Sequence, residues 1–182
     1  MGKIYKAKTK ELEKKLSDLG ARLCAGDDSQ VLVWVIPGKL ACAHRPLRKH
    51  PDYCGSQVDL PSDAAPLVLA WVRRIKHEGI QSVIAIMGDK ELAHYHLTDI
   101  GASGLLDLYE KEGLAVRRIN WEDPAHPAVS VGLPYDEQLE QARAAALDAF
   151  DAFPKPMLIH CSSGIQRSSP VAAFIFVHRS AQ

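Results

Sequence analysis

The residues best suited to chemistry lie near the end of the sequence, where Cys161 and Arg167 are separated by five residues. The short apolar run 157–160 predicts a buried strand, and 167–178 predicts an apolar helix. We therefore expect Cys161 at the end of a strand and Arg167 at the start of a helix, with a tight loop between them. Backbone N–H groups of such a loop and the positive end of the helix converge on one point, which makes an anion site.

This anion site has the parts of a nucleophilic centre that acts on phosphate. Gly164 allows a loop geometry that a side chain would obstruct. Arg167 offers a planar, two-pronged donor that matches phosphate oxygens. The same positive field favours the thiolate form of Cys161, and a thiolate beside a bound phosphoryl group is a nucleophile in place.

The segment His160-Cys161-x5-Arg167-Ser168 resembles the signature of the protein tyrosine phosphatase superfamily, most closely that of its compact dual-specificity branch. The resemblance extends over most of the chain, between residues 31 and 177. Residues 79–83 and 105–114 are similar to the cyclin-dependent-kinase-associated phosphatase branch. This resemblance implies a cysteine-phosphatase fold and hydrolysis of phosphate monoesters in two steps, with no metal and no cofactor.

The resemblance also implies a role for each residue of the signature. Cys161 would attack phosphorus and form a phosphocysteine, while Arg167 would bind the equatorial oxygens. Ser168 would donate a hydrogen bond to the sulfur and ease its departure in the second step. His160 would orient the loop through hydrogen bonds, without acting as a base. The remaining loop residues would bind phosphate: Ser162, Ser163, Gly164, Ile165 and Gln166.

Members of this superfamily also use a general acid, an aspartate on a loop that precedes the cysteine. Asp123 lies in a polar stretch with three prolines, 120–134, which we expect to be a long loop after a strand. Asp123 would protonate the leaving oxygen and then deprotonate the attacking water. Asp136, Glu122 and Asp89 are rivals for this role, and Trp121 is expected to be a hinge or packing residue of the loop.

Two features depart from the pattern of the superfamily. Gln166 replaces the glycine that is frequent just before the arginine, which affects how this position contacts water or substrate. The sequence given also ends soon after the signature helix, where relatives usually continue with further helices. Either the N-terminal helix takes their place or the chain is a truncated form.

Other residues carry weaker signals. Arg45 either helps to attract phosphate or makes a surface salt bridge. Cys42 or Cys54 either forms a protective disulfide with Cys161 or is an inert buried thiol, the reading that we favour. Three histidines lack zinc spacing, so we expect structural or exposed side chains and no metal site: His94, His96 and His126.

The regular elements that position these residues alternate between strands and helices, which indicates an α/β fold with a central, largely parallel sheet flanked by helices. We expect one domain, 1–182, with an N-terminal helical extension over about 1–30. The expected strands are 31–36, 40–43, 80–87, 114–119 and 157–160. The expected helices are 8–19, 66–77, 105–112, 135–153 and 167–178, with Ser62 or Asp63 as the cap of the second.

The composition is that of an ordinary globular protein. Lys and Arg total 22, as do Asp and Glu, so the overall charge gives no sign of a nucleic-acid or membrane partner. The four cysteines form no Cys-x-x-Cys pair, so we expect reduced thiols in a cytoplasmic protein. The expected substrate is a phosphorylated protein or peptide, with phosphotyrosine ahead of phosphoserine and phosphothreonine. Alternatives are a phosphoinositide, an RNA 5′ end, or phosphate binding without turnover; the sequence does not define the oligomeric state.

Overall fold

The computed structural model describes residues 2–55, 59–123 and 133–180, and its centre is a five-stranded sheet in the order β1-β2-β5-β3-β4. β1 pairs antiparallel with β2, and the other neighbours pair in parallel. The prediction of an α/β fold with a largely parallel sheet is therefore confirmed. The strands are β1 (Val33–Ile36), β2 (Leu40–His44), β3 (Ser82–Ile86), β4 (Ala115–Ile119) and β5 (Met157–Cys161).

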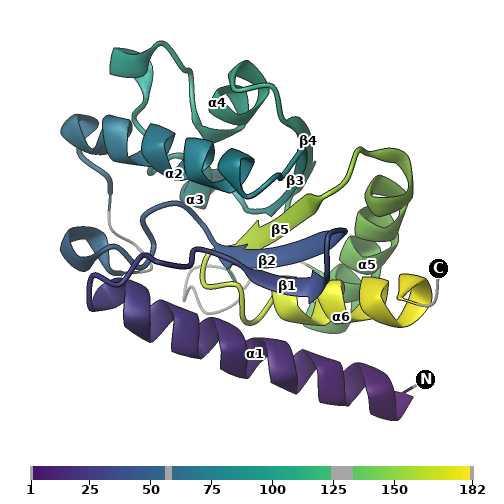
Figure 1. The fold of residues 1–182 in the computed structure, drawn as a ribbon. Helices are drawn as coiled ribbons and strands as arrows, with labels where there is room; N and C mark the ends of the chain where they lie inside the picture. The colour runs from purple at the N-terminus through teal and green to yellow at the C-terminus, as the bar shows by residue number, and fades with distance from the viewer. Residues whose placement is uncertain (1, 56–58, 124–132, 181–182) are drawn as a thin grey trace.

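Helices cover both faces of this sheet (Figure 1). On one face lie α1 (Gly2–Cys24), α5 (Tyr135–Ala152) and α6 (Ser168–Arg179), and α1 packs along α6. On the other face lie α2 (Ala65–His77) and α4 (Leu105–Lys111), while the short α3 (Asp89–Leu92) follows β3. None of the helices in the described part of the chain is both long and apolar enough to cross a membrane.

The central strands send alternate side chains into two separate cores, as the two-residue period of a strand requires. In β5, Ile159 and Cys161 contribute to the core beneath α1, α5 and α6, whereas Leu158 points into the core beneath α2 and α4. Both faces of the strand are buried, so β5 is apolar throughout, apart from His160. The Cys161 thiol thus lies on the side of the sheet that α1 and α6 cover.

Most predicted elements are confirmed within a few residues, and the differences have local causes. α1 extends well beyond 8–19 because its ends include good helix formers that show no periodic apolar face: Lys3, Lys6, Ala7, Ala21, Arg22 and Leu23. Its predicted inner face is correct, since Leu12, Leu16 and Leu19 are buried. The cap predicted at Ser62 or Asp63 is wrong, because a 3-10 turn (Ser62–Ala64) precedes α2 and the residue at its cap is Ala64.

Candidate active site

The candidate site forms where the parallel strands end at one edge of the sheet. Cys161 is the last residue of β5, the central strand, and β2 and β3 flank it. The segments that follow the neighbouring strands therefore reach the same place. Arg45 follows β2, Met87 and Gly88 follow β3, and Trp121 lies two residues beyond the end of β4.

The chain leaves Cys161 in a tight loop that turns at Gly164 and enters α6 at Ser168. Gly164 has a φ of +72°, and a Cβ there would lie 2.9 Å from the backbone oxygen of Ala43. Ser169 closes the turn, since its hydroxyl donates to the Gly164 carbonyl at 2.7 Å. Within the described chain, no backbone carbonyl accepts a hydrogen bond from the N–H groups of 163–167. These donors are the expected lining of an anion site.

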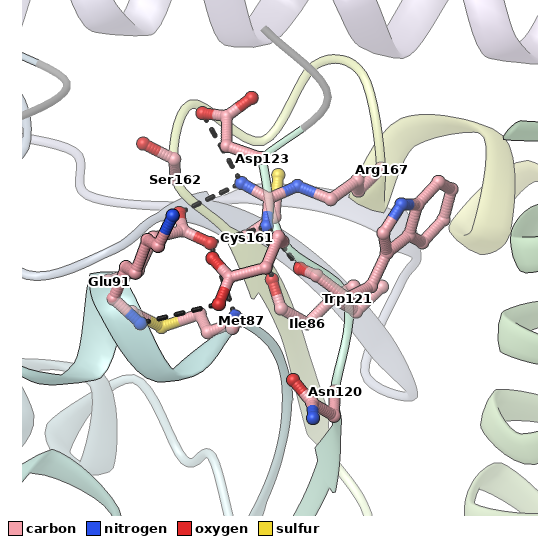
Figure 2. A network of polar contacts seen from close by, with 12 residues as sticks. Ile86, Met87, Glu91, Asn120, Trp121, Asp123, Cys161, Ser162 and Arg167 are labelled. Carbon is pink, nitrogen blue, oxygen red and sulfur yellow. Dashed lines mark hydrogen bonds and ion pairs between the residues drawn. The ribbon is translucent and has the colours of Figure 1, made fainter. Parts of the chain in front are cut away.

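Arg167 is held by a partner that the sequence did not reveal, Glu91 of α3 (Figure 2). Its Nη1 and Nη2 donate to the two carboxylate oxygens of Glu91 at 2.5 and 2.8 Å. Nη1 also donates to the carbonyl oxygens of Trp121 at 2.7 Å and Ile86 at 3.2 Å. Both charged side chains are buried, with 1% and 6% exposure, so the fork of Arg167 has a fixed orientation.

The other edge of the Arg167 guanidinium is less engaged. Its Nε is buried and has no hydrogen-bond partner among the described residues. Burial alone would lower the pKa of Arg167, but its contacts with Glu91 and the nearby Cys161 outweigh burial and raise that pKa. The guanidinium therefore remains charged, with an Nε donor left over for a ligand.

Asp123 is the only one of the four predicted acid candidates that the described structure pairs with Arg167, at 3.5 Å between Oδ2 and Nη2. Figure 2 shows it beside the Arg167 guanidinium and Ser162. The three rivals have other partners or are exposed. Glu122 accepts a hydrogen bond from the Lys90 amide at 3.4 Å. Asp89 pairs with Arg118, and Asp136 is exposed in the first turn of α5.

The predicted loop around Asp123 is described only in part, since 124–132, with His126, lies outside the described residues. At its start, Trp121 is buried and contacts the Tyr135 ring at a centroid distance of 5.3 Å, in keeping with a packing residue. Tyr135 in turn donates to the carbonyl oxygen of Gln166 at 2.7 Å. The aromatic pair thus connects the segment before Asp123 with the end of the loop 161–167.

His160 lies fully buried behind the loop. Its Nε2 lies 2.9 Å from the Tyr109 hydroxyl, and its Nδ1 lies 3.3 Å from the carbonyl oxygen of Cys161. Burial lowers the pKa of His160 to about 4, so the ring is neutral at neutral pH. This environment agrees with a residue that orients the loop and does not act as a base.

Ser168 begins α6 and is buried, but its hydroxyl has no hydrogen-bond partner among the described residues. The hydrogen bond that we expected between this hydroxyl and the Cys161 sulfur is therefore not formed in this structure. Ile165 packs against the core, and the side chain of Gln166 is exposed. Ser162 is buried, Ser163 is half-buried, and both lie in the turn directly after Cys161.

Two further arginines approach the loop from the segment after β2. The surface salt bridge considered for Arg45 is wrong, because Arg45 is buried and donates to the Tyr95 hydroxyl at 3.0 Å. Its amide also donates to the Ser162 carbonyl oxygen at 3.1 Å. Arg48, which sequence reasoning missed, donates from Nε to the Ser162 hydroxyl at 3.2 Å. Burial and the nearby Arg45 lower the pKa of Arg48. The loop thus has three cations around it.

The remaining cysteines and histidines differ in their relation to this site. Cys42 is a free thiol in the same buried core as Cys161, and burial together with the nearby Cys161 raises its pKa well above the ordinary value. Cys54 was expected to be buried, but it is exposed, because the turn that carries it projects from the surface. His94 pairs with Asp59, and His96 is exposed. In the described part of the chain, no three potential metal ligands come together.

Glu91 had a detectable signal that was not used. It lies five residues after β3, and β3 is a neighbour of β5 in a parallel sheet. An acidic residue at that edge is a natural partner for a buried arginine. The comparisons of the chain with protein-family models and with curated proteins found no match. The geometry of the site is therefore what supports a function.

Proposed function

We propose that the protein is a cysteine-dependent phosphatase of the protein tyrosine or dual-specificity type, with the fold of that class. It hydrolyses phosphate monoesters, phosphotyrosine above all, through a phosphocysteine. The observation that carries the proposal is the loop 161–167. It joins in one turn a thiol, backbone N–H groups and the Nε of a fixed guanidinium. Among the described residues, the N–H groups of 163–167 have no backbone acceptor and this Nε has no hydrogen-bond partner.

The phosphate of the substrate binds to the loop N–H groups and to Nε and Nη2 of Arg167. This second contact displaces the Asp123 carboxylate, which lies 3.5 Å from Nη2 in the unliganded protein. Glu91 keeps the guanidinium plane in place throughout, because it holds the opposite edge. The binding energy comes from charge-assisted hydrogen bonds to a buried, preorganised donor set.

In the first step, the Cys161 thiolate forms a bond to phosphorus while the bond from phosphorus to the ester oxygen breaks. Asp123, which takes up a proton from solvent as the anionic substrate displaces it from Arg167, gives this proton to the departing oxygen. In the second step, water attacks phosphorus, Asp123 takes a proton from it, and the S–P bond breaks. The hydroxyl of Ser168, which is buried and unpaired among the described residues, then turns to the sulfur as it regains its charge.

The alternative functions differ in the substrate that each would require. No lysine occurs among the loop residues 162–166 to meet the additional phosphates of a phosphoinositide, which favours a phosphoprotein. A binding module without turnover would have no use for the thiol of Cys161. We therefore keep the protein phosphatase as the main proposal and use the other substrates as tests.

The test is turnover of p-nitrophenyl phosphate by the wild-type protein, with a Cys161→Ser variant beside it. We expect a burst of p-nitrophenol and steady turnover from the wild type. The variant should lose turnover but still bind vanadate, because the loop donors and Arg167 remain. A variant as active as the wild type would contradict the covalent mechanism. A panel of phosphopeptides, phosphoinositide vesicles and 5′-triphosphate RNA then assigns the substrate.

A further inference from the structure

Two cysteines outside the candidate active site meet on the surface. Cys24 Sγ lies 2.6 Å from Cys54 Sγ, although the residues are 30 positions apart in the chain. The separation is little longer than a disulfide bond of about 2.05 Å. Cys24 is the last residue of α1, and Cys54 directly follows the 3-10 turn Pro51–Tyr53. Cys54 is exposed and Cys24 is partly exposed, so small reagents reach the pair.

We propose that Cys24 and Cys54 are a redox-active dithiol, which low-molecular-weight disulfides of the glutathione type oxidise to an intramolecular disulfide. This inference does not depend on the phosphatase proposal. The Cys54 thiolate attacks one sulfur of the small disulfide, whose S–S bond breaks and releases one small thiol. The Cys24 sulfur, its proton passing to water, then attacks Cys54 and releases the second small thiol. The protein loses two electrons, and the small disulfide gains them.

The order of these steps follows from the surroundings of the two thiols. Burial and the adjacent Cys54 raise the pKa of Cys24, which keeps Cys24 protonated. The exposed Cys54 is therefore the first to react, and Cys24 resolves the mixed disulfide. Cys42 is an internal contrast, since it is fully buried and has no access to reagents.

The disulfide would join two elements that both touch the catalytic loop. From α1, the methyl groups of Leu16 lie 3.2 and 3.4 Å from where a Cβ on Gly164 would be. From the segment before Cys54, Arg45 and Arg48 donate to the carbonyl and the hydroxyl of Ser162. The disulfide would therefore link α1 covalently to this segment. Because both elements contact the loop 161–167, the link would restrain that loop from two sides.

A cavity lies beside the Cys24–Cys54 pair, and residues next to each of the two cysteines line it. It has a volume of about 350 Å³ and is lined by Leu23 and Gly26 near Cys24, by Lys49 and Pro51 near Cys54, and by Trp71 of α2. Oxidation would fix the first two of these walls relative to each other. The region that the disulfide restrains thus includes the cavity as well as the loop.

Peptide mapping tests the pairing directly. Trypsin places each of the four cysteines in a separate peptide: 23–39, 40–48, 50–73 and 144–167. The full chain is equilibrated with reduced and oxidised glutathione, blocked with N-ethylmaleimide under denaturing conditions, digested and analysed by mass spectrometry. We expect a linked pair, 23–39 with 50–73, which disappears on reduction and in Cys24→Ser or Cys54→Ser. The link should persist in Cys161→Ser and in the matched control Cys42→Ala.

Two measurements then test whether the disulfide restrains α1 and the segment before Cys54. The oxidised protein should melt about 5–10 °C higher than the reduced protein, because the bond closes a ring of about 30 residues in the unfolded chain. Hydrogen exchange at the turn amides of Arg48, His50 and Tyr53 should also slow on oxidation, whereas Cys54→Ser should show neither change. A link between 50–73 and 144–167, or free thiols at both Cys24 and Cys54 after oxidation, would overturn the proposal. An unchanged melting temperature would contradict the inference that the disulfide restrains α1 and the segment before Cys54.

Discussion

Asp123 Oδ2 lies 3.5 Å from Nη2 of Arg167, so a carboxylate occupies the part of the guanidinium that our mechanism assigns to phosphate. The same side chain that would donate the proton thus competes with the substrate before binding. In the proposed mechanism, the substrate phosphate and Asp123 therefore exchange places at Arg167 in every cycle. This relationship gives Asp123 two separable effects, one on binding and one on chemistry.

For Asp123→Asn, we expect opposite changes in these two quantities. Loss of the negative charge should tighten inhibition by inorganic phosphate about fivefold or more, since a pair of unit charges about 4 Å apart interacts by about 1 kcal/mol even when water screens it fully. Loss of the proton donor should reduce kcat on phenyl phosphate by about 10²–10⁴-fold, and far less on an activated aryl ester. Asp89→Asn, an exposed control that pairs with Arg118, should change neither. Equal losses on both esters would move the acid role to another residue.

For Glu91→Gln, we expect a loss of both stability and activity, because it leaves the buried charge of Arg167 without its partner. Breaking one side of a buried ion pair costs about 3–5 kcal/mol, which urea unfolding measures. A misplaced guanidinium should also lower kcat/KM by about 10²-fold.

The double variant Glu91→Gln, Arg167→Met separates these two effects, since it leaves no unpaired buried charge. The double variant should be more stable than Glu91→Gln, but it should not regain activity. Glu122→Gln is the matched control near the same strand ends and should leave kcat/KM within about twofold of the wild type. Full activity of Glu91→Gln would show that Arg167 needs no support from α3.

For Gly164→Ala, we expect greater damage than at other glycines with a positive φ. Gly101 has a φ of +76°, and a Cβ there would meet nothing within 4 Å, so Gly101→Ala should cost only about 1–2 kcal/mol of backbone strain. At Gly164 the added Cβ would also meet the Ala43 oxygen at 2.9 Å. Comparison of the two variants by unfolding and by vanadate binding isolates the steric effect. If Gly164→Ala were as stable as Gly101→Ala and still bound vanadate, the loop would accommodate the added methyl group without a loss of stability.

The buried histidines predict a pH dependence of stability. Burial lowers the pKa values of His160 and His44 to about 4, below the ordinary value near 6.5. The unfolded chain therefore binds more protons than the folded chain between pH 6.5 and 4, so stability falls as the pH falls through this window. Each histidine contributes up to about 3 kcal/mol. Urea unfolding at several pH values should show a shallower fall in His160→Gln, whereas the exposed control His96→Gln should follow the wild type.

Much of the fold could be predicted from the sequence because the patterns that indicate its strands and helices lie within short segments. The strands β3 and β5 are short runs of apolar residues, and α5 carries its buried residues at helical spacing. The loop from Cys161 to Arg167 was predictable for the same reason, since a strand, a glycine and a helix follow one another directly.

The parts that the sequence did not reveal depend on contacts between distant segments. α3 has only four residues and shows no period, so no local pattern shows that Glu91 faces Arg167, and its place after β3 becomes informative only once the strand order is known. The burial of Arg45 depends on Tyr95, which lies 50 positions further along the chain. The contact of Cys24 with Cys54 likewise arises from the packing of α1 beside the segment after β2. Such pairs are set by the tertiary fold, which local patterns do not encode.

The central position of β5 also determines when the protein can be completed during synthesis. β5 is the last strand to be made, yet it fills the middle of the sheet between β2 and β3. Until it emerges from the ribosome, each of these two strands has an unpaired inner edge, which is open to association with other chains. The nascent protein therefore carries two such edges from the synthesis of β3 until that of β5. The need for chaperones should be greatest just before residues 157–161 leave the exit tunnel. The insertion of β5 ends this need and also forms the candidate loop 161–167.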